Sequence, residues 1–257
     1  MQRILISIIL MGAVSVSGWA HFPILLHDTP WARANQTVNF FYVYGHPYER
    51  EWVDTEAVSR ILAITPTNAK VDITKTLEIE SVEIRGEKIK RLVWQFKPTE
   101  PGDYLIAIDS EPYVSRNNAA YQDFVKITLH TERQDGWRQR TGQPLEIVPL
   151  TRPYGLEAGS VFTGRVMMSD KPIADAEIEV EHYLTEEPDL DALPPDPFIT
   201  RVVVTDPNGV FHITLPESGW WVVACAVDGI GRHVLDGKSY PLNGLAAMYI
   251  YVDESMK

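Results

Sequence analysis

Two histidines stand in settings that favour metal binding. His21 follows a predicted signal-peptidase site, so that cleavage would leave histidine as the first residue of the mature chain. His46 lies between Gly45 and Pro47, where a predicted strand over residues 37–44 has just ended. A terminal α-amine has a pKa of about 8, so a metal ion displaces its proton easily near neutral pH. The amine and the imidazole Nδ1 of a terminal His21 would then chelate one ion.

Such a chelate leaves coordination positions for further ligands. Pro23 has no backbone N–H, so the third residue of the mature chain cannot supply a deprotonated amide nitrogen. We expect His46 to be the next ligand, and His27 to be a third ligand or a group that orients the others. Nitrogen-rich sites suit nickel, cobalt, copper and zinc, and the divalent affinity order peaks at copper. The residues themselves do not choose among these metals.

Each of these residues also has an ordinary interpretation. His21 would be a solvated terminal residue, His46 a loop histidine that caps a following helix, and His27 a solvated loop residue. Glu49 would either orient the His46 ring through its second nitrogen or offset the dipole of that helix. The two sets of interpretations differ in whether the chain folds His46 back onto His21.

The first twenty residues predict where the protein goes. Arg3, an apolar run over residues 4–16, and small residues at Gly18 and Ala20 form a cleavable secretory signal over residues 1–20. The apolar run is shorter than the roughly 20 residues that a membrane span needs. We therefore expect a soluble, exported, periplasmic protein, with an uncleaved membrane anchor as the alternative.

Composition narrows the classes of function. The net charge is −12 and no basic residues cluster, so nucleic acid is not an expected partner. Cys225, the one cysteine, lies in an apolar run and is expected to be a buried, inert thiol. The sequence carries no Ser-His-Asp signature, no phosphate loop and no carboxylate pair at a recognisable spacing. We expect a protein that is not an enzyme.

Almost every periodic segment predicts a β-strand. A turn at residues 206–209 should join the strands before and after it into a hairpin, since Asn-Gly supplies the positive φ of a tight turn. Residues 49–60 are predicted to form a short helix after Pro47. The predicted strands cover residues 37–44, 88–96, 104–108, 123–131, 160–168, 176–183, 199–205, 210–215, 220–227 and 246–252.

These elements predict an all-β protein of two antiparallel β-sandwich domains. Residues 132–143 are polar and contain two glycines, and we place the domain boundary there. The N-terminal β domain, residues 21–143, would carry the candidate metal site. The C-terminal β-sandwich domain would cover residues 144–257.

Four stretches of the sequence resemble a known family, in the same order. They are residues 20–22 with Leu26, residues 45–49, residues 146–156 with Ala158, Gly159 and Phe162, and residues 205–211 with residues 219–221. Together they look like the periplasmic NikM-like proteins, the domain-of-unknown-function family 4198. The resemblance spans nearly the whole mature chain, and the run over residues 146–156 is its longest and most specific part.

The resemblance implies a periplasmic metal-binding protein associated with nickel or cobalt uptake. It also implies a second domain similar to the transthyretin-like or carboxypeptidase-regulatory sandwiches, and a metal uptake transporter or outer-membrane receptor as partner. The sequence departs from the family pattern where many members carry a histidine before the strand that begins near Asp123. Tyr121 and Gln122 stand there instead, so a ligand at that place is in doubt.

Three functions follow in order of expectation. The first is a periplasmic protein that binds a first-row transition metal ion, nickel or cobalt by resemblance, and supports its uptake or handling. The second is a structural or interaction β module of the cell envelope. The third is a copper-dependent oxidative enzyme, because a terminal histidine chelate can also activate oxygen.

Overall fold

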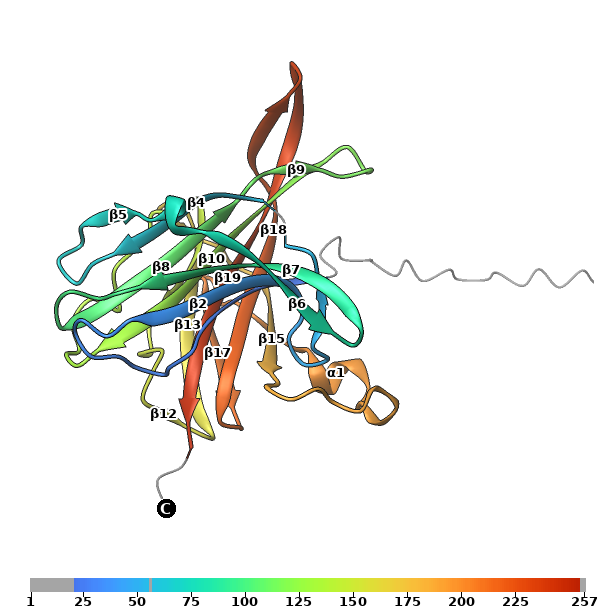
Figure 1. Ribbon diagram of the computed structural model, residues 1–257. Coiled ribbons are helices and arrows are strands. Elements are labelled where there is room, and N and C mark those ends of the chain that lie inside the picture. Colours follow the sequence, from blue (N-terminus) through green and yellow to red (C-terminus); the bar gives the residue numbers. More distant parts are fainter. Residues whose placement is uncertain (1–20, 56, 255–257) are drawn as a thin grey trace, which may run out of the picture.

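The computed structural model describes residues 21–55 and 57–254. The predicted secretory signal, residues 1–20, lies outside the described residues. The described part is all-β, as the sequence predicts, and its strands form three sheets (Figure 1). Its short helical segments are η1 (Thr74–Thr76), η2 (Leu190–Ala192) and α1 (Asp196–Ile199).

The first sheet has five strands in the order β1-β2-β7-β6, and β3 also pairs with β2. Its strands are β1 (Phe22–His27), β2 (Val38–His46), β3 (Glu51–Val53), β6 (Glu78–Ile84) and β7 (Glu87–Phe96). The third sheet has four strands, in which β13 pairs with β11, β14 and β17. Its strands are β11 (Leu145–Pro149), β13 (Ser160–Met168), β14 (Lys171–Pro172) and β17 (Val210–Leu215).

The second sheet has ten strands, and it shares one core with the first sheet and another with the third. Its main path is β16-β15-β18-β19-β10-β8-β4-β5, with β12 paired to β19 and β9 to β10. Its strands are β4 (Val58–Ile64), β5 (Lys70–Asp72), β8 (Gly102–Ser110), β9 (Tyr113–Val114), β10 (Ala120–Thr131), β12 (Leu156–Glu157), β15 (Glu177–Tyr183), β16 (Arg201–Val204), β18 (Gly219–Leu235) and β19 (Lys238–Asp253). Strand β10 pairs with β19 in parallel, so this sheet joins strands from both predicted domains.

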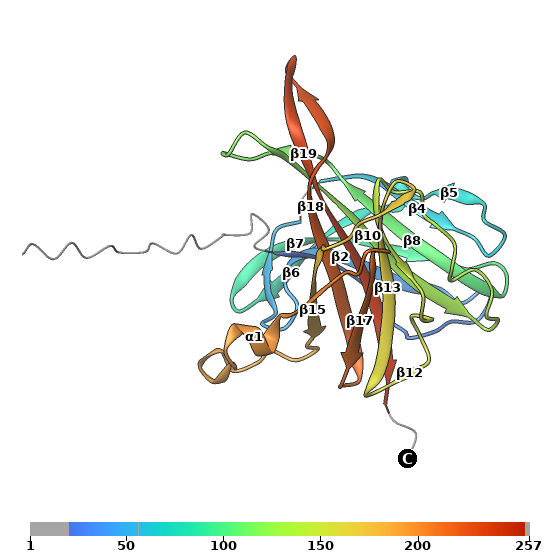
Figure 2. The same ribbon diagram turned by 180° about the vertical axis from the view of Figure 1, so that it is seen from behind.

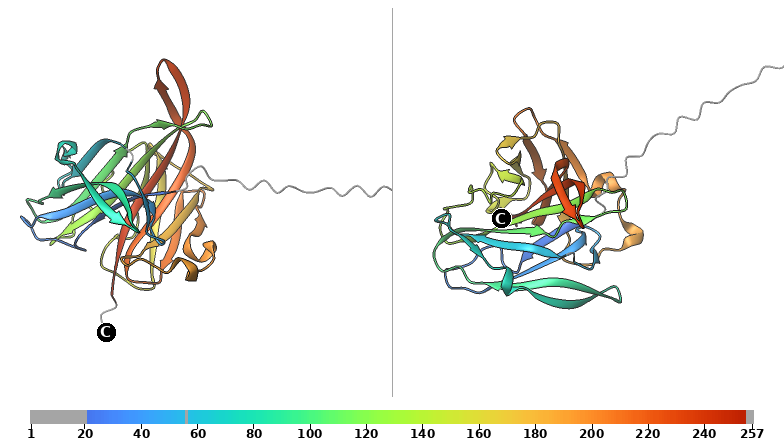
Figure 3. Two further views of the ribbon diagram at one scale, coloured as in Figure 1. Left: turned by 45° about the vertical axis from the view of Figure 1, so that its right-hand side comes forward. Right: turned by 90° about the horizontal axis from the view of Figure 1, so that it is seen from above.

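The three sheets stack as layers. Figure 3 shows, from above, the blue and teal strands of the first sheet on one side and the yellow and orange strands on the other. Figure 2 shows β13 and β17 on the side of the central strands that faces away from β2 and β7. The β18–β19 hairpin extends beyond these layers at its turn (Figure 1).

Successive side chains of the central strands point alternately into the two hydrophobic cores, one on each face of the second sheet. On β18, Trp220 and Val222 pack into the core shared with the first sheet. Trp221 and Val223 pack into the core shared with the third sheet. Cys225 belongs to this second core and is 1% exposed, so it is the buried thiol that the sequence predicts. Because both faces of these strands are covered, their sequences are nearly continuous apolar runs.

The predicted helix at residues 49–60 is wrong. The chain instead forms β3, which pairs back onto β2, and then β4, which pairs with β8. A four-residue turn over residues 47–50 makes this reversal, with Arg50 at a φ of 53°. Pro47, which suggested the helix start, therefore begins a turn, and pairing with β2 and β8 overrides local helix propensity in the residues that follow.

The predicted hairpin around residues 206–209 is only partly correct. The turn forms, with Gly209 at a φ of 72° and the Asp206 carboxylate accepting from the backbone of Asn208 and Val210, each at 2.8 Å. Its flanking strands do not pair with each other, because β16 joins β15 in the second sheet and β17 joins β13 in the third. The turn chemistry fixes the chain reversal but not the partner of each strand.

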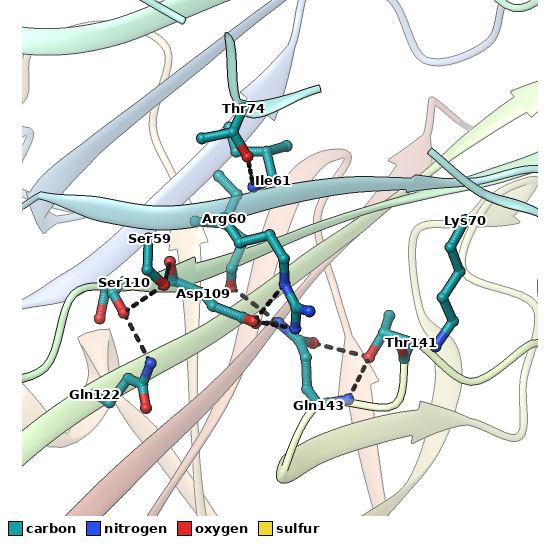
Figure 4. A network of polar contacts seen from close by, with 11 residues as sticks. Ser59, Arg60, Ile61, Lys70, Thr74, Asp109, Ser110, Gln122, Thr141 and Gln143 are labelled. Carbon is teal, nitrogen blue, oxygen red and sulfur yellow. Dashed lines mark hydrogen bonds and ion pairs between the residues drawn. The ribbon is translucent and has the colours of Figure 1, made fainter. Parts of the chain in front are cut away.

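Polar contacts hold the segment before β11 against the second sheet (Figure 4). The Gln143 amide donates to Asp109, 2.8 Å away, and Arg60 donates to the other carboxylate oxygen of Asp109. Nearby, Lys126 Nζ and Glu146 Oε1 form a buried ion pair at 2.7 Å. Residues on both sides of the predicted boundary are thus tied to one sheet.

Candidate metal site

The pairing of β1 with β2 brings His21 and His46 together. Phe22 lies opposite Gly45 in this antiparallel pair, so the next position outward places His21 opposite His46. Residues opposite each other on antiparallel strands point to the same face. The two imidazole rings have centroids 5.1 Å apart and planes inclined at 56°.

This ring spacing fits two imidazoles that share one ion. With metal–nitrogen bonds of about 2.0–2.1 Å, rings on neighbouring coordination positions have centroids roughly 4.5–5.5 Å apart. The observed 5.1 Å lies within that interval. Burial, and then the nearby His46, lower the pKa of the His21 imidazole below 6.5, although Glu51 acts in the opposite direction. The neutral ring that a metal requires is therefore favoured near neutral pH.

Side chains alone leave this pair short of a full ligand set. Glu51 lies opposite His46 on β3, but it is exposed. Within residues 21–55 and 57–254, no three histidine, cysteine, aspartate or glutamate side chains are grouped to hold an ion. Any complete set must therefore draw on the amine that processing before His21 would release, on water, or on a movement of Glu51.

The turn after His46 is fixed from two sides. At Gly45 a Cβ would lie 2.1 Å from the carbonyl oxygen of Glu51, so only glycine allows β3 to approach so closely. The Leu184 backbone N–H donates to the Pro47 carbonyl at 3.2 Å. The Arg50 guanidinium donates to the Thr185 carbonyl. His46 is thus held by the end of β15 as well as by its own sheet.

A buried polar chain that the sequence analysis missed lies on the same face of β2 as His46. The Tyr42 hydroxyl donates to the Tyr44 hydroxyl at 3.0 Å, and the Tyr44 hydroxyl donates to the Asp123 carboxylate on β10. Burial raises the pKa of Tyr44 well above its usual value. Asp123 is 2% exposed and lies on the same face of β10 as the core residue Val125. An acidic residue on the apolar face of a predicted strand is therefore the sequence feature that could have indicated this buried chain.

His27 lies at the opposite end of β1 from His21. Six residues of strand at about 3.3 Å each separate the two by roughly 20 Å. The His27 ring is buried edge-on against Trp220 and near Phe40, and its Nε2 lies 3.4 Å from the Thr128 carbonyl. Burial lowers its pKa to about 4. The structure therefore gives His27 a place in the core, away from the pair formed by the other two histidines.

Glu49 does not approach the His46 ring through any described hydrogen bond. Its charge acts instead on Glu181, a buried carboxyl on β15. The interpretation of Glu49 as a group that orients the imidazole has no support from this placement.

Comparisons with known proteins give a family but no function. The family described as "Domain of unknown function (DUF4198)" matches residues 18–229. No curated protein sequence matches the chain significantly. The described residues contain no helix long and apolar enough to cross a membrane.

The two solved structures described next are distant likenesses. The D0-D1 domain of intimin is 12% identical over 90% of this chain and 100% of that chain, with a TM-score of 0.20. A DUF4785 family protein from Legionella pneumophila is 7% identical over 88% of this chain and 56% of that chain, with a TM-score of 0.31. Scores this low support no statement about relationship or activity.

Proposed function

The chain belongs to the DUF4198 family, and we propose that its processed form binds one divalent first-row transition metal ion through His21 and His46. The observation that carries this proposal is the contact of the two imidazole rings across β1 and β2, with centroids 5.1 Å apart. Nickel or cobalt is favoured by the resemblance to NikM-like proteins, with copper and zinc as the other candidates.

The proposed donors are the α-amine and Nδ1 of His21 and one ring nitrogen of His46. Pro23 has no backbone N–H to lose, so the third residue of the processed chain adds no amide nitrogen to the chelate. Glu51 lies opposite His46 on β3, and in this proposal it moves to complete the shell with one carboxylate oxygen or through water. Such a half-open set suits a protein that holds an ion and passes it on. The biological setting that we propose is the periplasm, with a metal uptake transporter or outer-membrane receptor as partner.

The first experiment tests the terminal amine. Protein that begins at His21 is compared with protein carrying one additional glycine before it, by calorimetric titration with Ni²⁺, Co²⁺ and Cu²⁺. Moving the amine by one residue breaks the chelate ring, and the affinity should fall by about tenfold or more, which equals 1.4 kcal/mol or more. Equal affinity in the two proteins would refute the proposed amine ligand.

The second experiment tests the loop histidine. His46→Ala should weaken binding of the same ion by at least about tenfold, whereas His212→Ala should leave it unchanged. His212 is an exposed histidine on β17 whose ring bonds Thr163, so it is a matched control far along the chain. If His46→Ala binds the ion as tightly as the wild type, the proposed site is refuted.

A further inference from the structure

A pocket of about 470 Å³ lies beyond the opposite end of β1 from His21, and the metal proposal makes no use of it. Four segments meet there: the segment after β1, the end of β10, the segment after β11, and the end of β19. It includes Arg152, Tyr154 and Gly155, which belong to the run over residues 146–156 that carries the most specific part of the family resemblance.

A chain of contacts fixes one wall of this pocket. Asp103, fully buried, bonds His130 Nδ1 at 2.8 Å. The His130 ring stacks on Tyr154 with centroids 4.2 Å apart. The Arg152 guanidinium lies 5.1 Å from the Tyr154 ring centroid, and its Nε donates to the Tyr154 carbonyl at 3.1 Å. At Gly155 a Cβ would come within 3.1 Å of the same guanidinium, so glycine leaves room for it. The wall is therefore organised before any ligand arrives.

This wall presents both acceptors and donors to the pocket. Because the Asp103 carboxylate accepts, Nδ1 of a neutral His130 ring is the donor and Nε2 is left as an acceptor. In the described part of the chain, neither this Nε2 nor the two Nη atoms of Arg152 form a protein hydrogen bond. Glu132, the residue after β10, and Asp253, the last residue of β19, add carboxylate oxygens to the lining.

Aromatic side chains form the apolar part of the lining. Trp31 is 48% exposed, although its segment is anchored by a hydrogen bond of 2.9 Å from the Ala32 N–H to the His130 carbonyl. Tyr251 also lines the pocket, and its ring packs edge-on against Trp220 with centroids 5.0 Å apart. An exposed indole on an anchored backbone is the arrangement of a stacking surface rather than of a core residue.

The charged and aromatic side chains that line the pocket limit the kinds of ligand that it can bind. Glu132 and Asp253 line the pocket together with Arg152, and the whole chain carries a net charge of −12, so an anionic ligand is disfavoured. A purely apolar ligand would leave these polar groups buried without partners. A sugar ring has hydroxyls that both donate and accept, and a C–H face that packs on an aromatic ring. Pockets for small ligands occupy about 300–1,000 Å³, and this one lies towards the smaller end. We propose that the pocket binds a neutral pyranose saccharide of one or two sugar units.

The test is calorimetric titration, with tryptophan fluorescence in parallel, of the processed protein at millimolar saccharide. The probes are glucose, galactose, N-acetylglucosamine, cellobiose, lactose and chitobiose, with glucuronate and a lysine-containing tripeptide as charged comparators. At least one neutral sugar should bind. Trp31→Ala should weaken that binding by about tenfold, since an aromatic contact contributes up to about 1.5 kcal/mol. Arg152→Gln should weaken it as well.

Three controls make the outcome decisive. Phe198→Ala removes an aromatic side chain that is 70% exposed on α1, outside the pocket, and should leave saccharide binding unchanged. His46→Ala should also leave it unchanged, which separates this site from the metal proposal. Because Trp31 is exposed, its alanine variant should keep the thermal midpoint of the wild type. The proposal is overturned if no neutral sugar binds, if only a charged comparator binds, or if binding survives both pocket substitutions.

Discussion

Glu181→Gln should change how the stability of the protein depends on pH. Glu181 lies on β15, is 2% exposed, and faces the core between the first and second sheets near the turn that follows His46. Burial raises its pKa from 4.5 to about 7, against a hydrogen bond from Thr200, and the charge of Glu49 raises it further. The folded protein therefore holds the proton more tightly than the unfolded chain does.

The sign and the size of the effect follow from this difference. The stabilisation is fully present below pH 4.5 and is lost as the pH rises through about 7. A pKa that moves from 4.5 to about 7 corresponds to roughly 3 kcal/mol of unfolding free energy lost across that interval. Glutamine stays neutral and keeps an oxygen for Thr200, so the variant should avoid this loss.

Urea denaturation followed by circular dichroism measures the effect directly. Near pH 4.5 the variant and the wild type should unfold at similar urea concentrations, whereas above pH 7 the variant should be more stable by up to about 3 kcal/mol. Glu177→Gln, at an exposed position of the same strand, is the control and should follow the wild type at every pH. Parallel stability profiles for Glu181→Gln and the wild type would refute the reasoning.

Three further predictions rest on single contacts. Glu146→Gln should lower the unfolding free energy, measured in urea titrations, by about 3–5 kcal/mol. The substitution leaves the buried Lys126 ammonium without its counter-charge. A loss below about 1 kcal/mol would contradict this prediction. Gly45→Ala should destabilise the protein by about 1–3 kcal/mol and weaken metal binding, because the alanine Cβ would displace the Glu51 carbonyl. Thermal unfolding measures the first effect and calorimetry the second. An unchanged result in both would count against this prediction. Nickel affinity should already decline as the pH falls below about 8, because the α-amine must lose its proton to bind. Since burial keeps the pKa of the His21 ring below 6.5, the ring itself stays neutral over this range. Calorimetry in which affinity is constant between about pH 8 and pH 6.5 would argue against the amine as a ligand.

The fold class could be predicted because alternation is a local property. Val38, Phe40 and Tyr42 repeat with a period of two, and the structure places all three in the core of the first sheet. Strand β1 was missed for the same reason, since Phe22–His27 is buried at every position and shows no alternation. A strand covered on both faces leaves no periodic signal that separates it from other apolar segments.

The sequence did not allow us to predict which polar side chains are buried. Nothing in the sequence around His182 indicates burial, yet this residue is 8% exposed, with its ring stacked on Trp221 and its Nε2 2.9 Å from the Ser218 carbonyl. Glu181, its neighbour, is buried on the other face of the same strand. A strand with a polar residue on each face is expected to expose both residues to solvent. Here both are buried, because the strand is covered by other parts of the protein on both faces.

The sequence by itself determined the local features of this protein: the strands with a clear period, the turn at Asp206 and Gly209, and a buried Cys225. Each of these depends on residues within a few positions of one another. The tertiary structure alone decided which strands pair and which side chains meet. His21 and His46 lie in contact because β1 and β2 pair in one register, and that register is set by the packing of both strands against residues from the far half of the chain.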